Sequence, residues 1–138
     1  MRKGFEITVE ADENYIRCKV FVDISIPIAI QFTEELDKLA KEKGIKRIFM
    51  DLRSVVNIAG AGENYKFSRT EVHNLKPQDN YVAMLISEGD HSHDFVETVS
   101  QNAGYGVRLF TNEAEALAWL LHPLHGWAYN EFLAAPYI

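Results

Sequence analysis

The sequence predicts one α/β domain with a mostly parallel five-stranded sheet, an antiparallel N-terminal edge strand and about four helices. Two segments near the start alternate polar and apolar residues, which is typical of strands with one wet face. Three later segments are short and almost continuously apolar, as expected of strands covered on both faces. Amphipathic segments of helical period separate them, and this alternation favours right-handed crossovers and a parallel sheet.

The first two strands form a predicted hairpin. Apolar and polar residues alternate over 5–10 and again over 16–22, and the polar run 11–14 turns the chain between them. Cys18 takes an inward position in the second strand. The first strand is therefore expected at the antiparallel edge of the sheet.

The first helix has both ends marked in the sequence. Pro27 stands near its start and Gly44 ends it, which are the positions that these residues favour. Its apolar residues recur at helical spacing: Ile28, Phe32, Leu36 and Leu39. The segment is predicted to be an amphipathic helix with one face on the sheet.

Three strand and helix units complete the predicted domain. The strands are expected at 48–52, 81–86 and 107–110. One helix should follow the Gly/Ala-rich turn 59–62 and end before Pro77, and another should lie between Gly89 and Gly104. Asn112 and Glu115 resemble a capping box that opens the last helix. The inner stripe of that helix is Leu117, Leu120 and Leu121.

Composition limits the class of protein. The 138 residues include 14 basic and 20 acidic side chains, for a net charge of −6, and no Lys/Arg cluster is present. Such a chain repels polyanions, so we expect no nucleic-acid partner. Cys18 is the only cysteine, which excludes an intrachain disulfide. The first residues lack a signal-peptide pattern, so we expect a cytoplasmic protein. No apolar run reaches the ~18 residues of a membrane span, so we expect no such span.

The chain is expected to divide into a domain at 1–122 and an apolar tail at 123–138. The tail carries Trp127, Tyr129, Phe132, Leu133 and Tyr137, too much apolar surface to leave in water. It should pack either on its own domain or on a second subunit of a homodimer.

Two motifs resemble the STAS superfamily of anti-sigma-factor antagonists. Asp51-Leu52-Arg53-Ser54-Val55 matches the Asp-Leu-x-x-Val strand that leads to the antagonists' regulatory site. The site itself reads Asp-Ser-Ser-Gly in antagonists and carries the phosphorylated serine; here it is Ala59-Gly60-Ala61-Gly62. The run Ala116-Leu117-Ala118-Trp119-Leu120 resembles the Ala-x-x-Trp-Leu ending of the SpoIIAA-like branch.

This resemblance implies a small α/β domain that acts by contact with regulatory proteins or by binding small ligands. Catalysis is not typical of the family, and the resemblance implies no cofactor. Because the phosphorylatable serine is missing, a constitutive docking module or a ligand-sensing domain fits better than the phosphorylation cycle.

The first candidate site loop follows the strand at 48–52. Arg53 and Asn57, with backbone amides near Gly60 and Gly62, could hold a carboxylate or phosphate at a helix start. Alternatively, Arg53 pairs with an acid such as Asp51 or Asp90, and the glycines only permit a tight turn.

The second candidate loop is Ser87-Glu88-Gly89-Asp90-His91-Ser92-His93-Asp94. Its imidazoles and carboxylates suit a transition metal, although the spacing matches no established zinc signature. In another reading, Asp90 or Ser92 caps a helix whose first turn contains Asp94. A third has His91 or His93 facing the Arg53 loop and tuning anion binding with pH.

Both loops are expected at the carboxyl edge of the sheet, where parallel sheets bind ligands. The sequence therefore supports a non-catalytic STAS-like regulatory or ligand-sensing module, expected as a homodimer, whose partner is a regulatory protein or a small anionic or lipid ligand. The alternative is a metal-dependent hydrolase centred on the loop from Asp90 to His93. The predicted ligand-binding residues are Arg53, Asn57, Gly60, Gly62, Ser87, Asp90, His91 and His93.

Overall fold

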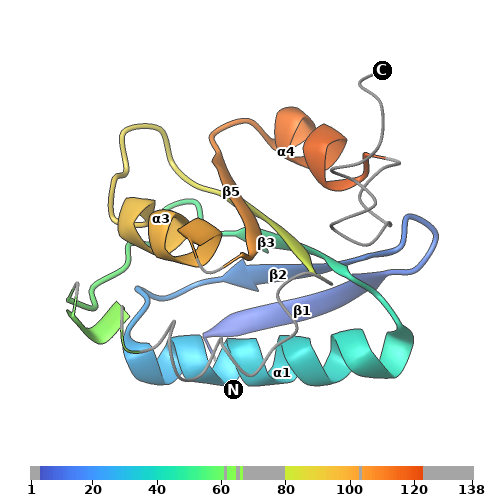
Figure 1. Cartoon of the computed structure of the whole chain (residues 1–138), viewed down its shortest axis with the longest axis horizontal. Coiled ribbons are helices and arrows are strands. Elements are labelled where there is room, and N and C mark those ends of the chain that lie inside the picture. Colours follow the sequence, from blue (N-terminus) through green and yellow to red (C-terminus); the bar gives the residue numbers. More distant parts are fainter. Residues whose placement is uncertain (1–3, 61, 65, 67–79, 103, 123–138) are drawn as a thin grey trace.

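The computed structural model describes residues 4–60, 62–64, 66, 80–102 and 104–122 (Figure 1). The strands are β1 (Phe5–Glu10), β2 (Tyr15–Val20), β3 (Arg47–Asp51), β4 (Tyr81–Leu85) and β5 (Gly106–Phe110). The helices are α1 (Ile26–Lys43), α3 (Asp94–Asn102) and α4 (Glu113–Leu120). Residues 62–64 and 66 are also helical, and the rest of the helix expected before Pro77 lies outside the described residues.

The five strands form one mixed sheet in the order β1-β2-β3-β4-β5. The strand β1 pairs with β2 in antiparallel register, and every later neighbouring pair is parallel. This confirms the predicted fold class, including the antiparallel edge strand. The second strand ends at Val20 rather than Val22, where the chain leaves the sheet toward α1.

Helix α1 begins and ends where the sequence marks it. The Ser25 hydroxyl accepts the backbone N–H of Ile28 at 3.5 Å, and Pro27 lies in the first turn, where no intrahelical donor is needed. Gly44 has φ 65°, the left-handed conformation that ends helices and favours glycine. At α4, the Asn112 side chain accepts the backbone N–H of Glu115 at 2.9 Å, which confirms the predicted cap.

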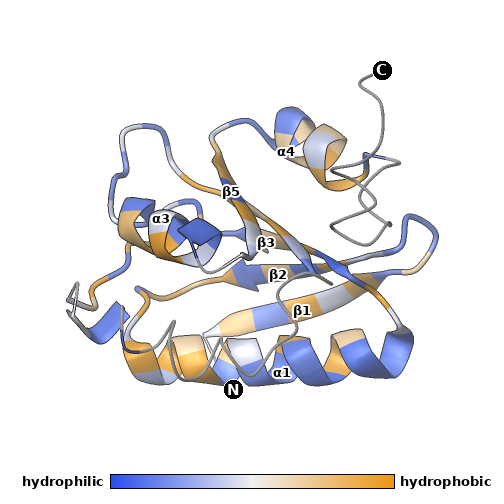
Figure 2. Cartoon of the chain, in the orientation of Figure 1, coloured by the Kyte–Doolittle hydropathy of each residue, from blue (hydrophilic) through white to orange (hydrophobic). Residues whose placement is uncertain are grey.

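Helices cover both faces of the sheet and produce two cores. On one face, α1 packs over Ile16, Cys18, Ile48 and Met50, and α3 lies beside β5. On the other face, α4 covers Phe49, Ala83 and Leu85. Figure 2 shows that hydrophobic residues gather in the first turns of α1 and hydrophilic ones toward its end. The buried residues of α1 nevertheless extend along most of its length: Ala29, Leu36 and Ala40.

The predicted tail at 123–138 lies outside the described residues, so its packing on the domain or on a second subunit stays a prediction. Among the described residues, no helix has both the length and the apolar character needed to cross a bilayer.

Candidate functional site

The two candidate loops meet at the carboxyl edge of the sheet. The backbone N–H of Ser54 donates to the Ser87 hydroxyl at 2.8 Å, and that of Asn57 donates to the Ser92 hydroxyl at 3.0 Å. Ser54 has φ 70°, an uncommon conformation for a residue other than glycine. The loops after β3 and β4 are thus joined by side chain to backbone hydrogen bonds.

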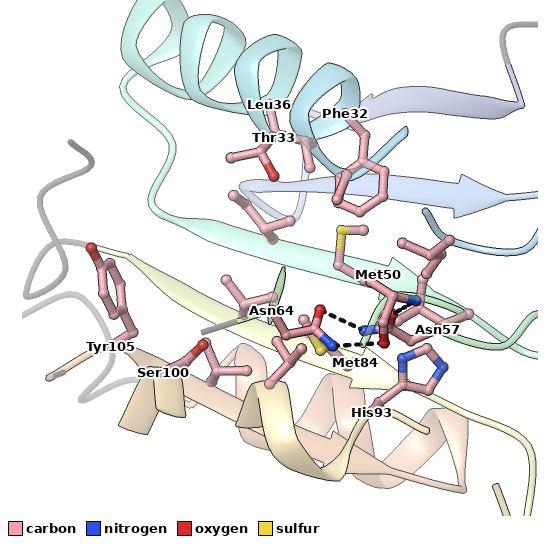
Figure 3. Close-up of a pocket in the computed structure, with 18 of the residues that line it drawn as sticks. Phe32, Thr33, Leu36, Met50, Asn57, Asn64, Met84, His93, Ser100 and Tyr105 are labelled. Carbon is pink, nitrogen blue, oxygen red and sulfur yellow. Dashed lines mark hydrogen bonds between the residues drawn. The ribbon is translucent and has the colours of Figure 1, made fainter. Parts of the chain in front are cut away.

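A pocket of about 150 Å³ opens between α1 and α3, over β3 and β4 (Figure 3). Its wall is mainly apolar, as expected of a small-molecule site. The methionines Met50 and Met84 are register partners on adjacent strands and form part of its floor. Other apolar lining residues are Ala29, Phe32 and Leu36 from α1, Ile48 and Val82 from the sheet, and Val96 from α3.

Buried polar residues concentrate at this pocket. Four polar or charged residues of the described chain are buried: Asp51, Asn64, His93 and Ser100. All but Asp51 line the pocket. Burying a polar group costs free energy unless it finds a partner, so such groups around a cavity indicate a site rather than ordinary packing.

One end of the pocket is formed by His93, Asn57 and Asn64 (Figure 3). The Asn57 amide nitrogen donates to the Asn64 side-chain oxygen at 3.1 Å, and Asn57 accepts the backbone N–H of Ala59 at 2.9 Å. The Asn64 amide nitrogen donates to the Ala59 carbonyl at 3.2 Å. These bonds fix both amides while each NH₂ group keeps one hydrogen for another acceptor.

His93 is held by the loops on either side of it. Its Nε2 lies 3.3 Å from the Asp90 carboxylate and 3.4 Å from the Val55 carbonyl oxygen. The Asp90 side chain also accepts the backbone N–H of Ser92 at 2.9 Å. Although partial burial opposes ionisation of Asp90, the hydrogen bonds from Ser92 hold its pKa below the usual value.

Hydroxyl-bearing residues of the lining include Thr33, on α1 beside Phe32 and Leu36, and Ser100 and Tyr105, at the end of the pocket away from His93 (Figure 3). Burial raises the pKa of the Tyr105 phenol, which keeps it neutral at physiological pH. The pocket therefore has an apolar middle between two ends that can form hydrogen bonds.

Arg53 lies on the other face of the sheet. Its guanidinium binds the Asp51 carboxylate through two bonds, Nε to Oδ1 at 3.0 Å and Nη2 to Oδ2 at 2.8 Å. Glu113 of α4 lies 3.3 Å from Arg53 and 3.2 Å from Arg17, and Arg17 stacks over the Phe49 ring. We call the four residues Arg17, Asp51, Arg53 and Glu113 the charge cluster.

The charged side chains of the charge cluster form hydrogen bonds and ion pairs with one another. Burial opposes ionisation of Asp51, but the side-chain and backbone hydrogen bonds from Arg53 prevail and hold the pKa of Asp51 below its usual value. The bond to Asp51 also raises the pKa of Arg53. The predicted pairing of Arg53 with Asp51 is thus present, and the guanidinium is directed away from the pocket.

The structure brings only some of the eight predicted site residues together. Asn57 and His93 line the pocket, and Ser87 and Asp90 support it through the bonds given above. His91 points to solvent, where it contacts Asp94 at 3.0 Å. Gly60 donates its backbone N–H to Glu63, and neither Gly60 nor Gly62 lines the pocket.

The loop from Asp90 to Asp94 separates its possible metal ligands into two pairs, one buried and one exposed. Within the described part of the chain, no group of three or more His, Cys, Asp or Glu side chains is arranged to hold a metal ion. The predicted caps, Asp90 and Ser92, bind the loops instead of the first amides of α3. Asp94 lies in the first turn of α3, as predicted.

Several pocket residues were not predicted from the sequence, chiefly Thr33, Asn64, Ser100 and Tyr105. Thr33 follows Phe32 on the pocket face of α1, and Ser100 lies one turn after Val96 on the pocket face of α3. A hydroxyl on an inward helix face is the signal that could have indicated them.

Comparison with known proteins supports the fold. The structure is similar to the crystal structure of an uncharacterized protein of the DUF3478 family with a SpoIIAA-like fold from Shewanella loihica PV-4. The match has a TM-score of 0.56 and 19% identity, and covers 85% of this chain and 93% of that one. No known protein-family profile matches the chain, and no curated protein matches it. The chain has a SpoIIAA-like fold, as the sequence motifs predicted.

Proposed function

We propose that this domain is a non-catalytic ligand-sensing module that binds a small, largely apolar molecule in the pocket between α1 and α3. The observation that carries the proposal is the gathering of buried polar residues around an otherwise apolar cavity. A cavity near 150 Å³ is comparable with engineered apolar cavities that bind benzene. The ligand therefore has an apolar part of roughly that size and a polar group at one end or both.

A sensing role agrees with the loops around the pocket. Ala59, Gly60 and Ala61 stand where antagonists of the resembling family carry the regulatory Asp-Ser-Ser, so phosphorylation at that position is not available. Asn57 and His93 connect the pocket to both loops at the carboxyl edge. A ligand that contacts these side chains would shift the conformations that the two loops populate. A protein partner that binds these loops would then distinguish the ligand-bound domain from the free one.

The test is binding of an uncharged fluorescent probe close to the size of the cavity, 1-aminonaphthalene, to the full chain. We expect saturable binding by the wild type and its loss in Val82→Phe, because Val82 lies on the pocket floor and a phenyl ring would occupy the cavity. The matched control is Val22→Phe, which places the same ring at an exposed position outside the pocket. Equal binding by the wild type and both variants, or no binding by the wild type, would contradict the proposal.

A further inference from the structure

The structure assigns His93 as the residue that selects the polar end of the ligand: we infer that the pocket prefers an apolar alcohol over the carboxylate of the same chain length. This inference rests on the proposed function and names the class of ligand. It depends on which nitrogen of the His93 ring carries hydrogen and which one faces the pocket.

Among the described residues, both partners of the His93 Nε2 are acceptors. The Val55 carbonyl oxygen at 3.4 Å cannot donate, and Asp90, with its pKa held low, is a carboxylate at neutral pH. Nε2 must therefore carry the hydrogen in the neutral ring. In that tautomer Nδ1 has a lone pair and acts as an acceptor.

The contact between His93 and Asp90 is longer than a charge-assisted hydrogen bond. Charge-assisted N–H···O bonds are about 2.7–2.9 Å long, whereas the His93 Nε2 to Asp90 Oδ2 distance is 3.3 Å. The imidazole side chain is only 3% exposed and lines a mainly apolar cavity. At the pH of the experiment below, about 8, an imidazole is ordinarily neutral, so only one of its two nitrogens carries hydrogen.

The remaining ring nitrogen of His93, Nδ1, can accept a hydrogen bond from a ligand in the pocket. Nδ1 forms no hydrogen bond with any described residue, and Figure 3 shows the ring at the end of the pocket shared with Asn57 and Asn64. The side-chain oxygens of Asn57 and Asn64 each accept one hydrogen bond already, and each NH₂ group keeps one hydrogen for the pocket. This end thus presents an acceptor at Nδ1 and a pair of donors.

A hydroxyl group matches this set because it donates one hydrogen bond and accepts others. A carboxylate only accepts, so it would place its charge against the Nδ1 lone pair and near the Asp90 carboxylate. An ether oxygen also only accepts and would leave Nδ1 without a hydrogen. Discrimination of this kind is strong, since the unpaired group is buried.

The experiment compares three competitors for the fluorescent probe at about pH 8, where a free carboxylic acid is ionised. They are octanol, octanoate and heptyl methyl ether, which has the same number of heavy atoms as octanol. We expect octanol to bind at least about tenfold more tightly than either of the others. In His93→Gln the difference should fall below about threefold, because an amide both donates and accepts. His91→Gln is the matched control, since His91 is exposed and outside the pocket.

Each outcome separates this inference from the proposed function. If the probe binds and all three competitors displace it equally, or octanoate is the strongest, the inference is wrong and the proposed function stands. If the probe does not bind the wild type, the proposed function fails. If His91→Gln changes the preference as much as His93→Gln does, His93 is not the selecting residue.

Discussion

At the carboxyl edge of the sheet, the buried polar groups on the two faces differ in how their hydrogen bonds are satisfied. On the α4 face, both Asp51 oxygens accept hydrogen bonds from Arg53, and Arg17 and Glu113 complete the charge cluster. On the α1 and α3 face, His93, Asn57 and Asn64 surround a cavity with hydrogen-bonding capacity remaining. The pocket on this second face has space for another molecule.

This difference shows why charge alone is a poor guide to a site in this fold. Arg53 is the most obvious anion-binding residue of its loop, yet the charge cluster already supplies its anion. A buried group whose partners are all internal contributes to stability, whereas a buried group that faces a cavity can contribute to binding. Substitutions on the α4 face should therefore change stability, and those on the pocket face should change binding.

The largest expected contrast is between two truncations. Leu120 of α4 is fully buried, so Leu120→Ala should lower the free energy of unfolding by about 3 kcal/mol. Met84→Ala on the pocket floor should cost only about 1 kcal/mol, because Met84 is partly buried and already borders a cavity. Urea unfolding followed by circular dichroism measures both values.

The contrast between the faces would be lost if Met84→Ala cost as much as Leu120→Ala. That result would mean that the pocket wall is as tightly packed as the core under α4. Val22→Ala, at an exposed position outside both cores, serves as the control and should change the free energy of unfolding by less than about 0.5 kcal/mol.

The sequence predicted the fold well because its signals are local. Alternation placed β1 and β2, Gly44 marked the end of α1, and Asn112 marked the start of α4. The meeting of the two loops also followed from topology, since carboxyl ends of parallel strands share an edge.

The sequence could not predict on which face each loop side chain would lie. Beyond the end of β3 the alternation of strand residues no longer applies, and the turn at Ser54, with φ 70°, separates Arg53 from Asn57. Arg53 thereby returns to the face of Asp51, and Asn57 lies at the pocket. The pocket itself combines Thr33, Asn64 and Ser100, which are distant in sequence and have no shared motif.

A second prediction concerns the charge cluster. Asp51→Ala should destabilise the protein by about 2–3 kcal/mol, because it removes a buried carboxylate and the charge-assisted hydrogen bonds from Arg53. Thermal unfolding measures the loss, and the same protein should retain its affinity for the fluorescent probe at a temperature where it is folded. Weaker probe binding by the folded variant would show that the two faces are coupled.

The third prediction is the pH dependence of that stability. The folded pKa of Asp51 is lower than its unfolded value, so its contribution is present above about pH 4 and is lost as the pH falls through the folded pKa. Unfolding free energies measured from pH 6 downward should fall more steeply in the wild type than in Asp51→Asn. The pKa of Asp90 is also lowered in the folded protein, so Asp90→Asn should flatten part of the same pH profile. Identical profiles for the wild type and Asp51→Asn would contradict the assignment.

The smallest effect should come from Glu113, which joins α4 to the charge cluster. Its side chain is 41% exposed, and its contacts with Arg17 and Arg53 are 3.2 and 3.3 Å long, so water and salt screen both ion pairs. Glu113→Gln should therefore cost no more than about 0.5–1 kcal/mol, and the difference from the wild type should shrink in high salt. Asp51 would retain Arg53 in this variant, because their paired bonds do not depend on Glu113. A loss as large as that of Asp51→Ala would instead show that α4 depends on this ion pair, and that the buried carboxylate alone does not hold the charge cluster.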